Sequence, residues 1–349
     1  MPCVLECTYL FMKKIFIYTS LLLMLVACGR PAPRKTAKPP LTTEVLIKTT
    51  PVKDQGRSQL CWAYAMLATI ESEHLMMGDS VNLSTDYVAR MMLLDQTRQY
   101  YLSRGEHVIS MRGMCPMLIH YIETYGAMPF DSYNSKSEIN YQVLGRKLMR
   151  MTASQHSLSG IDAQAATMMD HEIEYLPKIV FMLGAEYTPL EFAHSVCRVD
   201  EYVSLTSFTH HPFYQKFVLE VPDNQMHDEF MNLPIDTLMA RIKHTLRTGH
   251  PVCWEGDISE PGFSFAQGIA VTGSHRPCTQ AERQRQFESL RTTDDHCMEL
   301  IGIARSRKGH LYFIAKNSWG TANPFGGMMY LSENYVRLKT IAVYMKKKK

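Results

Sequence analysis

Cys61 has the surroundings of a nucleophile. A polar loop around Gly56 precedes it, and from Cys61 onward apolar residues recur at helical spacing until Gly78, a typical C-terminal stop. Cys61 is therefore expected at the N-terminus of a helix, where unpaired N–H groups and the helix dipole favour negative charge. A thiol in that position ionises more readily, and the thiolate is the form that attacks a carbonyl carbon.

A base for this thiol is expected far along the chain. The residue pattern predicts two strands, 295–304 and 310–316, joined by a polar turn. His296 opens the first strand and Asn317 follows the second, so a hairpin would bring both to the same end. A side-chain amide that holds an imidazole fixes its tautomer for proton exchange with a thiol. His310 is a rival base, but it is predicted at the turn, away from Asn317.

These residues resemble the papain-like cysteine peptidases. The matching motifs are Gln55 six residues before Cys61-Trp62, His296 followed by small and apolar residues, and Asn317-Ser318-Trp319-Gly320. The resemblance implies a peptide-hydrolysing site with Cys61 as nucleophile, His296 as base and Asn317 as its orienting partner.

The same resemblance assigns roles to three further side chains. The Gln55 side chain and the Cys61 backbone N–H would donate to the oxyanion that develops during attack. Trp319 would shield the bond between histidine and asparagine from water, and Trp62 is expected beside the catalytic residues, in contact with them or with the substrate. Peptides are the implied substrates, and the mechanism needs no metal or organic cofactor.

Several looser segments resemble one branch of this family, bleomycin hydrolase and bacterial aminopeptidase C. They include LSTDYVARMM and LRTGHPVCWEGDIS, and the stretch 136–198 resembles the helical insertion of that branch. Two features differ from it. Gln59 stands where the family usually has Gly, and the last strand-like stretch, LKTIAVYM, runs directly into Lys346–Lys349, which leaves little chain for an arm that enters the cleft. The choice between exopeptidase and endopeptidase therefore stays open.

Two other functions are compatible with the sequence. Gln59 and Leu60 beside the nucleophile would suit a peptide-binding lipoprotein on a catalytically decayed scaffold. An amidase acting on non-peptide or cell-wall amides would keep the same chemistry with another substrate. The intact Cys, His and Asn motifs favour an enzyme.

The cysteines do not form a recognisable metal motif. Cys3 and Cys7 lie in a segment expected to be removed, and six others besides Cys28 remain in the folded part without any CxxC spacing. Buried free thiols are expected, with room for one disulfide. His296-Cys297 is a poor metal pair, because successive side chains on a strand point to opposite faces. His210-His211 is interpreted as a loop feature, and no metal site is predicted.

The N-terminal residues have the pattern of a secretion signal. Lys13-Lys14 is followed by the apolar run from Ile15 to Ala27, which is too short to span a bilayer comfortably, and then by Cys28. The ending Leu-Val-Ala-Cys resembles a bacterial lipobox, in which Cys28 would carry the lipid. We therefore expect a signal peptide over 1–27, a tether over 28–48, and a protein anchored in the lipid bilayer of the bacterial cell envelope.

Length and composition fit one large two-lobed unit over residues 49–349. The chain has 349 residues, 46% of them hydrophobic, and a formal charge of +3, which does not indicate nucleic-acid binding. A mean hydropathy of −0.17 excludes a polytopic membrane protein. The expected fold class is α+β and papain-like: a helical lobe (helices near 61–77, 84–103 and 114–125) carries Cys61, and an antiparallel sheet or barrel lobe carries His296 and Asn317. A helix is also predicted from Pro234 to Arg247. The sequence does not determine whether the chain forms oligomers.

Overall fold

A single large sheet carries His296 and Asn317. The computed structural model describes residues 41–182, 184–274 and 276–347. Within them, eleven strands form one sheet in the order β5-β6-β4-β13-β7-β10-β11-β12-β9-β8, with β1 also paired to β10. These strands are β1 (Leu41–Leu46), β4 (Tyr202–Thr206), β5 (Lys216–Val218), β6 (Glu229–Asn232), β7 (Val252–Gly256), β8 (Phe263–Ser264), β9 (Ile269–Ala270), β10 (His296–Ser306), β11 (Leu311–Lys316), β12 (Met328–Ser332) and β13 (Thr340–Lys346).

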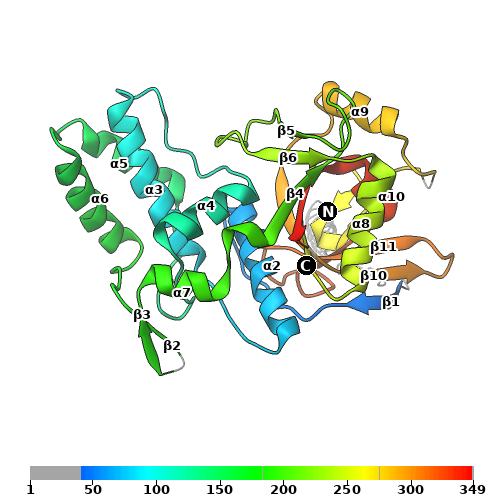
Figure 1. The fold of residues 1–349 in the computed structure, drawn as a ribbon, viewed down its shortest axis with the longest axis horizontal. Helices are drawn as coiled ribbons and strands as arrows, with labels where there is room; N and C mark the ends of the chain where they lie inside the picture. Colours follow the sequence, from blue (N-terminus) through cyan, green and yellow to red (C-terminus); the bar gives the residue numbers. More distant parts are fainter. Residues whose placement is uncertain (1–40, 183, 275, 348–349) are drawn as a thin grey trace, which may run out of the picture. The chain divides into compact units, whose positions relative to one another are not determined.

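The helices fall into two groups along the chain (Figure 1). The first group forms the helical lobe and the second accompanies the sheet, which together with these helices is the sheet lobe. The helical lobe contains α2 (Cys61–Met77), α3 (Thr85–Leu102), α4 (Cys115–Tyr125), α5 (Tyr141–Thr152), α6 (Leu158–Glu172) and α7 (Pro189–Val196), with a hairpin of β2 (Val180–Met182) and β3 (Ala185–Tyr187). The sheet lobe contains α8 (Ile235–Arg247), α9 (Gln280–Glu288), α10 (Glu333–Lys339) and two short 3-10 turns, Val199–Glu201 and Phe265–Gln267.

Each lobe has its own hydrophobic core. Trp62, Leu67 and Met92 belong to the core of the helical lobe, which also reaches Cys253 and Cys297 on the sheet. The core of the sheet lobe contains side chains such as Trp254 and Phe313, packed under α8 and α10. Because α2 contacts both β10 and β7, the first residues of α2 lie against the strand that begins with His296.

Strand β10 is the centre of this arrangement. It pairs antiparallel with β7 on one side and with β11 on the other, and β1 pairs with its second half. Most pairs in the sheet are antiparallel, and β9/β12 and β4/β6 are parallel. This mixed architecture confirms the predicted α+β class, with Cys61 in a helical lobe and His296 and Asn317 in a sheet lobe.

Several predicted elements are confirmed with small shifts. The three predicted helices of the first lobe are α2, α3 and α4, and the helix predicted from Pro234 is α8. The stretch 136–198 contains α5, α6 and α7, of which α5 and α6 pack against α3, together with the β2/β3 hairpin, which was not predicted.

Two expectations about the sheet lobe need correction, and one of its helices was not predicted. The tether predicted to reach residue 48 is too long, because Leu41–Leu46 is strand β1, hydrogen-bonded to β10. The last strand-like stretch, LKTIAVYM, is divided. Its first two residues end helix α10, which Ser332 caps at the other end, and the strand is Thr340–Lys346. Helix α9 was not predicted, because its residues are mostly polar. In the described part of the chain, none of the helices combines the length and apolar character that crossing a membrane requires.

Candidate active site

Cys61 is the first residue of α2. The N-cap residue, Leu60, offers no side-chain hydrogen bond, so the first N–H groups of the helix have no capping partner and leave a positive end beside the thiol. Trp62 is buried, and its indole N–H donates to the Met111 carbonyl at 3.0 Å. Trp62 therefore fixes the start of the helix from the core side, and Cys61 stays half-buried at the surface of the lobe.

The Cys61 thiol lies in contact with the strand that carries His296. A side-chain hydrogen bond from Cys297 is the largest influence on it, and it lowers the pKa of Cys61. Burial raises the pKa, but a hydrogen bond and the charge of His296 lower it further, and the balance lies well below the ordinary thiol value. This arrangement favours the thiolate, the nucleophilic form.

His296 and Asn317 meet at the same end of the β10/β11 hairpin, as predicted. Pairing of Glu299 with Lys316 places the start of β10 beside the residue that follows β11. His296 Nε2 lies 2.7 Å from Asn317 Oδ1, and both side chains are buried. Since a carbonyl oxygen only accepts, Nε2 carries the donated proton and Nδ1 is left as the ring nitrogen for Cys61.

Trp319 covers this pair. Its ring centroid is 4.7 Å from that of His296, and it also stacks edge-on against Phe263 and Phe265, at 5.9 and 5.4 Å. The Trp319 ring thus lies where the resemblance implies a cover for the bond between His296 and Asn317, and an apolar cover lowers the local dielectric around such a bond.

Gln55 is tied to the residue after Asn317. Its backbone N–H donates to the Ser318 carbonyl at 2.8 Å, and its side-chain oxygen accepts from Ser318 Oγ at 2.6 Å. One N–H of its amide donates to the Ser58 carbonyl, which leaves a second N–H on the same nitrogen. The loop before α2 is thus held against the sheet lobe with Gln55 between the two.

The chain shows a relationship at the level of both sequence and fold. Residues 180–349, just under half of the chain, match the profile of the Peptidase C1-like family, and this part contains His296, Asn317 and Trp319. Over residues 180–349 the sequence is similar to the Peptidase C1-like family. No curated protein matches the sequence significantly.

Solved structures with the papain-like fold resemble the whole chain. PepW from Lactobacillus rhamnosis HN001 is 17% identical, with a TM-score of 0.67 over 99% of this chain and 92% of that one. Digestive procathepsin L 3 of Tenebrio molitor (16% identity, TM-score 0.42, 90% and 72% covered) and bromelain from Ananas comosus (14%, 0.41, 86% and 94%) resemble it more weakly. The likeness to PepW establishes the papain-like fold and confirms that prediction.

The papain-like scaffold holds a group of side chains that the sequence analysis did not bring together. Cys115, Cys253, Cys297 and Glu255 meet beside the active site, and the sulfurs of Cys115 and Cys253 are 3.2 Å apart. Burial raises the pKa of Cys115, but hydrogen bonds from Cys253 and Cys297 outweigh it and lower that pKa to about 6. Burial raises the pKa of Glu255 well above its usual range. The only sequence signal was i, i+2 spacing of Cys253 and Glu255 on one strand.

The remaining candidates lie elsewhere. His310 sits at the turn end of the β10/β11 hairpin, where its N–H donates to Ser306 Oγ. His210 and His211 both contact Glu220 in an exposed loop. All six cysteines among the described residues are free. Cys28, the predicted lipidation site, lies outside the described residues.

Proposed function

We propose that the chain is a cysteine peptidase that hydrolyses peptide bonds through a Cys61 acyl-enzyme. The observation that carries the proposal is the hydrogen bond between His296 Nε2 and Asn317 Oδ1, which leaves the other ring nitrogen for the Cys61 thiol, whose pKa is lowered. A nucleophile, a base in contact with it and a group that orients the base are the three parts that covalent acyl transfer requires.

The proposed reaction has two halves. The Cys61 thiolate attacks the peptide carbonyl, and the oxyanion accepts hydrogen bonds from the Cys61 backbone N–H and the free amide N–H of Gln55. His296, which has taken the Cys61 thiol proton at Nδ1, gives that proton to the leaving amine. In the second half His296 takes a proton from water, and the resulting hydroxide equivalent releases the acyl group and restores the thiolate.

A pocket next to Gln55 is a candidate place for part of the substrate. It is lined by Gln55 and Tyr64, and by residues 134–139 and Tyr141 from the segment that leads into α5. Because this segment belongs to the start of the helical insertion, we propose that the insertion shapes substrate choice. The insertion and the likeness to PepW along nearly the whole chain support the finer proposal of bleomycin hydrolase or aminopeptidase C character.

Activity of the Cys61→Ala variant tests the proposal. Wild type should cleave a quenched fluorescent peptide library, and Cys61→Ala should show no turnover. Cys197→Ala, which removes a buried thiol at the C-terminal end of α7, should behave like wild type. A thiol-directed peptide probe should label Cys61 and no other cysteine. Turnover by Cys61→Ala, or a wild type that binds peptides without cleaving or being labelled, would reject the peptidase and favour a binding protein.

Matched peptides with free and blocked amino termini separate the two modes of cleavage. An aminopeptidase should release the first residue of the free peptide and leave the blocked one intact, whereas an endopeptidase should cut both at internal bonds. Non-peptide and cell-wall amides in the same assay test the amidase alternative directly.

We also propose that Cys28 anchors the chain in the bacterial cell envelope. The support is the basic residues, the short apolar run and the Cys that follows it. Expression in a bacterium with an alkyne-tagged fatty acid should label wild type and not Cys28→Ser, and only wild type should sediment with membranes. Equal labelling of both proteins would contradict the anchor.

A further inference from the structure

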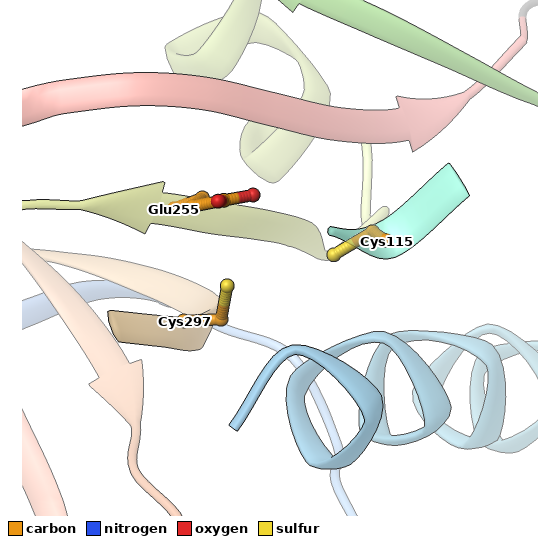
Figure 2. A group of neighbouring side chains, drawn as sticks. All are labelled: Cys115, Glu255 and Cys297. Atoms are coloured by element: carbon orange, nitrogen blue, oxygen red, sulfur yellow. The ribbon is translucent and has the colours of Figure 1, made fainter. Parts of the chain in front are cut away.

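Three side chains of metal-ligand type converge in the interior next to the active site. Cys115, Glu255 and Cys297 come from α4, β7 and β10, and their ligand atoms all lie within 4.8 Å of one another. Figure 2 shows both sulfurs and the carboxylate pointing into the space that the three elements enclose. Their exposures are 0%, 1% and 2%, so the group is sealed from solvent.

Strand register explains why the residues meet. Cys297 lies directly opposite Glu255 in the antiparallel pairing of β10 with β7, so both side chains project from the same face of the sheet. Cys115 is the first residue of α4 and approaches that face from the helical lobe. Cys253, two residues before Glu255, projects to the same side and brings a fourth donor, 3.2 Å from the Cys115 sulfur. His296 points to the opposite side of β10 and stays with Asn317.

The group lacks a positive charge. Across the described ranges 41–182, 184–274 and 276–347, Glu255 has no ion pair with Lys, Arg or His, and its one side-chain hydrogen bond comes from Tyr344 Oη at 2.9 Å. No basic side chain of these ranges therefore occupies the place that a cation would take beside the Glu255 carboxyl group. Thiolate and carboxylate are also the donors that zinc takes in proteins.

We propose that Cys115, Glu255 and Cys297 bind one zinc-class divalent cation, with Cys253, 3.2 Å from the Cys115 sulfur, as a further donor for the fourth position. Zn–S and Zn–O bonds of about 2.3 and 2.1 Å in a tetrahedron place ligand atoms about 3.5–3.8 Å apart. Because no two of the ligand atoms are more than 4.8 Å apart, reaching this geometry requires each side chain to move by less than about 1 Å. The cation replaces the protons of Cys115, Cys297 and the Glu255 carboxyl group, which leave to solvent, so Cys297 no longer donates to Cys61 in the metal-bound chain.

A second group provides an internal comparison. His210 and His211 each direct Nε2 to Glu220, at 3.2 and 2.6 Å, and these three atoms could also gather around a cation. Here the ligands lie at the surface, and the carboxylate is already engaged by both imidazoles. Any zinc bound at this loop should be lost in His211→Ala and retained in the cysteine variants.

Metal content of the purified full chain tests the proposal. Protein incubated with Zn²⁺ and then dialysed against metal-free buffer should retain about one zinc per chain by elemental mass spectrometry. Cys115→Ser, Cys297→Ser and Glu255→Gln should each lose most of it, and Cys278→Ser and His211→Ala should keep it. Glu255→Gln still accepts the hydrogen bond from Tyr344, and near-ultraviolet circular dichroism checks that each variant is folded.

A cobalt spectrum gives a readout that does not depend on activity. Co²⁺ in place of Zn²⁺ should show a thiolate-to-metal charge-transfer band that weakens in Cys115→Ser and Cys297→Ser. Cys61→Ala should keep both zinc and the band, so the metal site is tested independently of the proposed peptidase activity. Absence of retained zinc in folded wild type, zinc lost only with His211→Ala, or a Cys115–Cys253 disulfide in place of metal would each overturn the inference.

Discussion

Replacing Asn317 by Ala removes the partner that orients the His296 imidazole. The bond from His296 Nε2 to Asn317 Oδ1 is 2.7 Å long, and both residues are almost fully buried, so water does not replace the lost acceptor. When His296 carries a positive charge during turnover, a hydrogen bond of this kind is worth about 1.5–3 kcal/mol. At about 1.36 kcal/mol per tenfold change in rate, kcat/KM should fall roughly 10- to 150-fold.

The assay is initial-rate cleavage of a fluorogenic peptide, with urea unfolding of each variant measured in parallel. Asn317→Asp should retain more activity than Asn317→Ala, because a carboxylate still accepts from Nε2 and from the Ser318 backbone N–H. The matched control is Asn334→Ala, which removes an equal side chain that bonds Cys278 and Ser274 in the sheet lobe. If folded Asn317→Ala cleaves the peptide within twofold of wild type, Asn317 does not orient the base.

Three further outcomes follow from the structure. Hydrogen bonds from Cys297 and His296 lower the pKa of Cys61. Alkylation of Cys61 by iodoacetamide in the presence of EDTA should therefore stay fast well below about pH 8.5, where alkylation of an ordinary thiol slows. A rate that falls with pH as steeply as that of free cysteine would contradict this. Lys339→Met should lower the free energy of unfolding by about 3–5 kcal/mol, because fully buried Lys339 lies 3.7 Å from the buried carboxylate of Asp257; urea titration would show no change if the pair were solvated. Gly126→Ala should lower the melting temperature, since Gly126 has φ +88° and an added Cβ would lie 2.3 Å from the Pro189 backbone; an unchanged midpoint in a thermal melt would disprove the clash.

The nucleophile helix and the hairpin could be predicted because their signals are local. Cys61 begins a helix that ends at Gly78 in the left-handed conformation, and the sequence marks both ends. His296 and Asn317 bound two continuous apolar runs separated by a short polar turn, a pattern with few alternative structures. Their distance from Cys61 in the chain is bridged by tertiary packing, which the family resemblance supplied and residue spacing did not.

The features that were not predicted depend on tertiary packing or, in one helix, on a capping motif. Strand β1 has four of its six residues exposed and exists because β10 offers an edge, so its own residues carry little strand signal. Helix α9 is polar, but Thr279 and Glu282 form a capping box that the sequence contains and that marks its start. The cluster of Cys115, Glu255 and Cys297 follows from the register of β7 with β10, which no local pattern specifies.

The position of β13 has a consequence for synthesis on the ribosome. Residues 340–346 lie between β4 and β7, so the β7 edge that faces β4 remains unpaired until these residues have been translated. Val252 and Trp254, which β13 helps to bury, stay exposed and can contact other chains during that interval. Strand β10, which bears His296, is then paired with β7 in a sheet that is still incomplete. A nascent chain stalled before Thr340 should therefore need a chaperone to avoid aggregation. Its sheet is complete only after β13 has paired with β4 and β7.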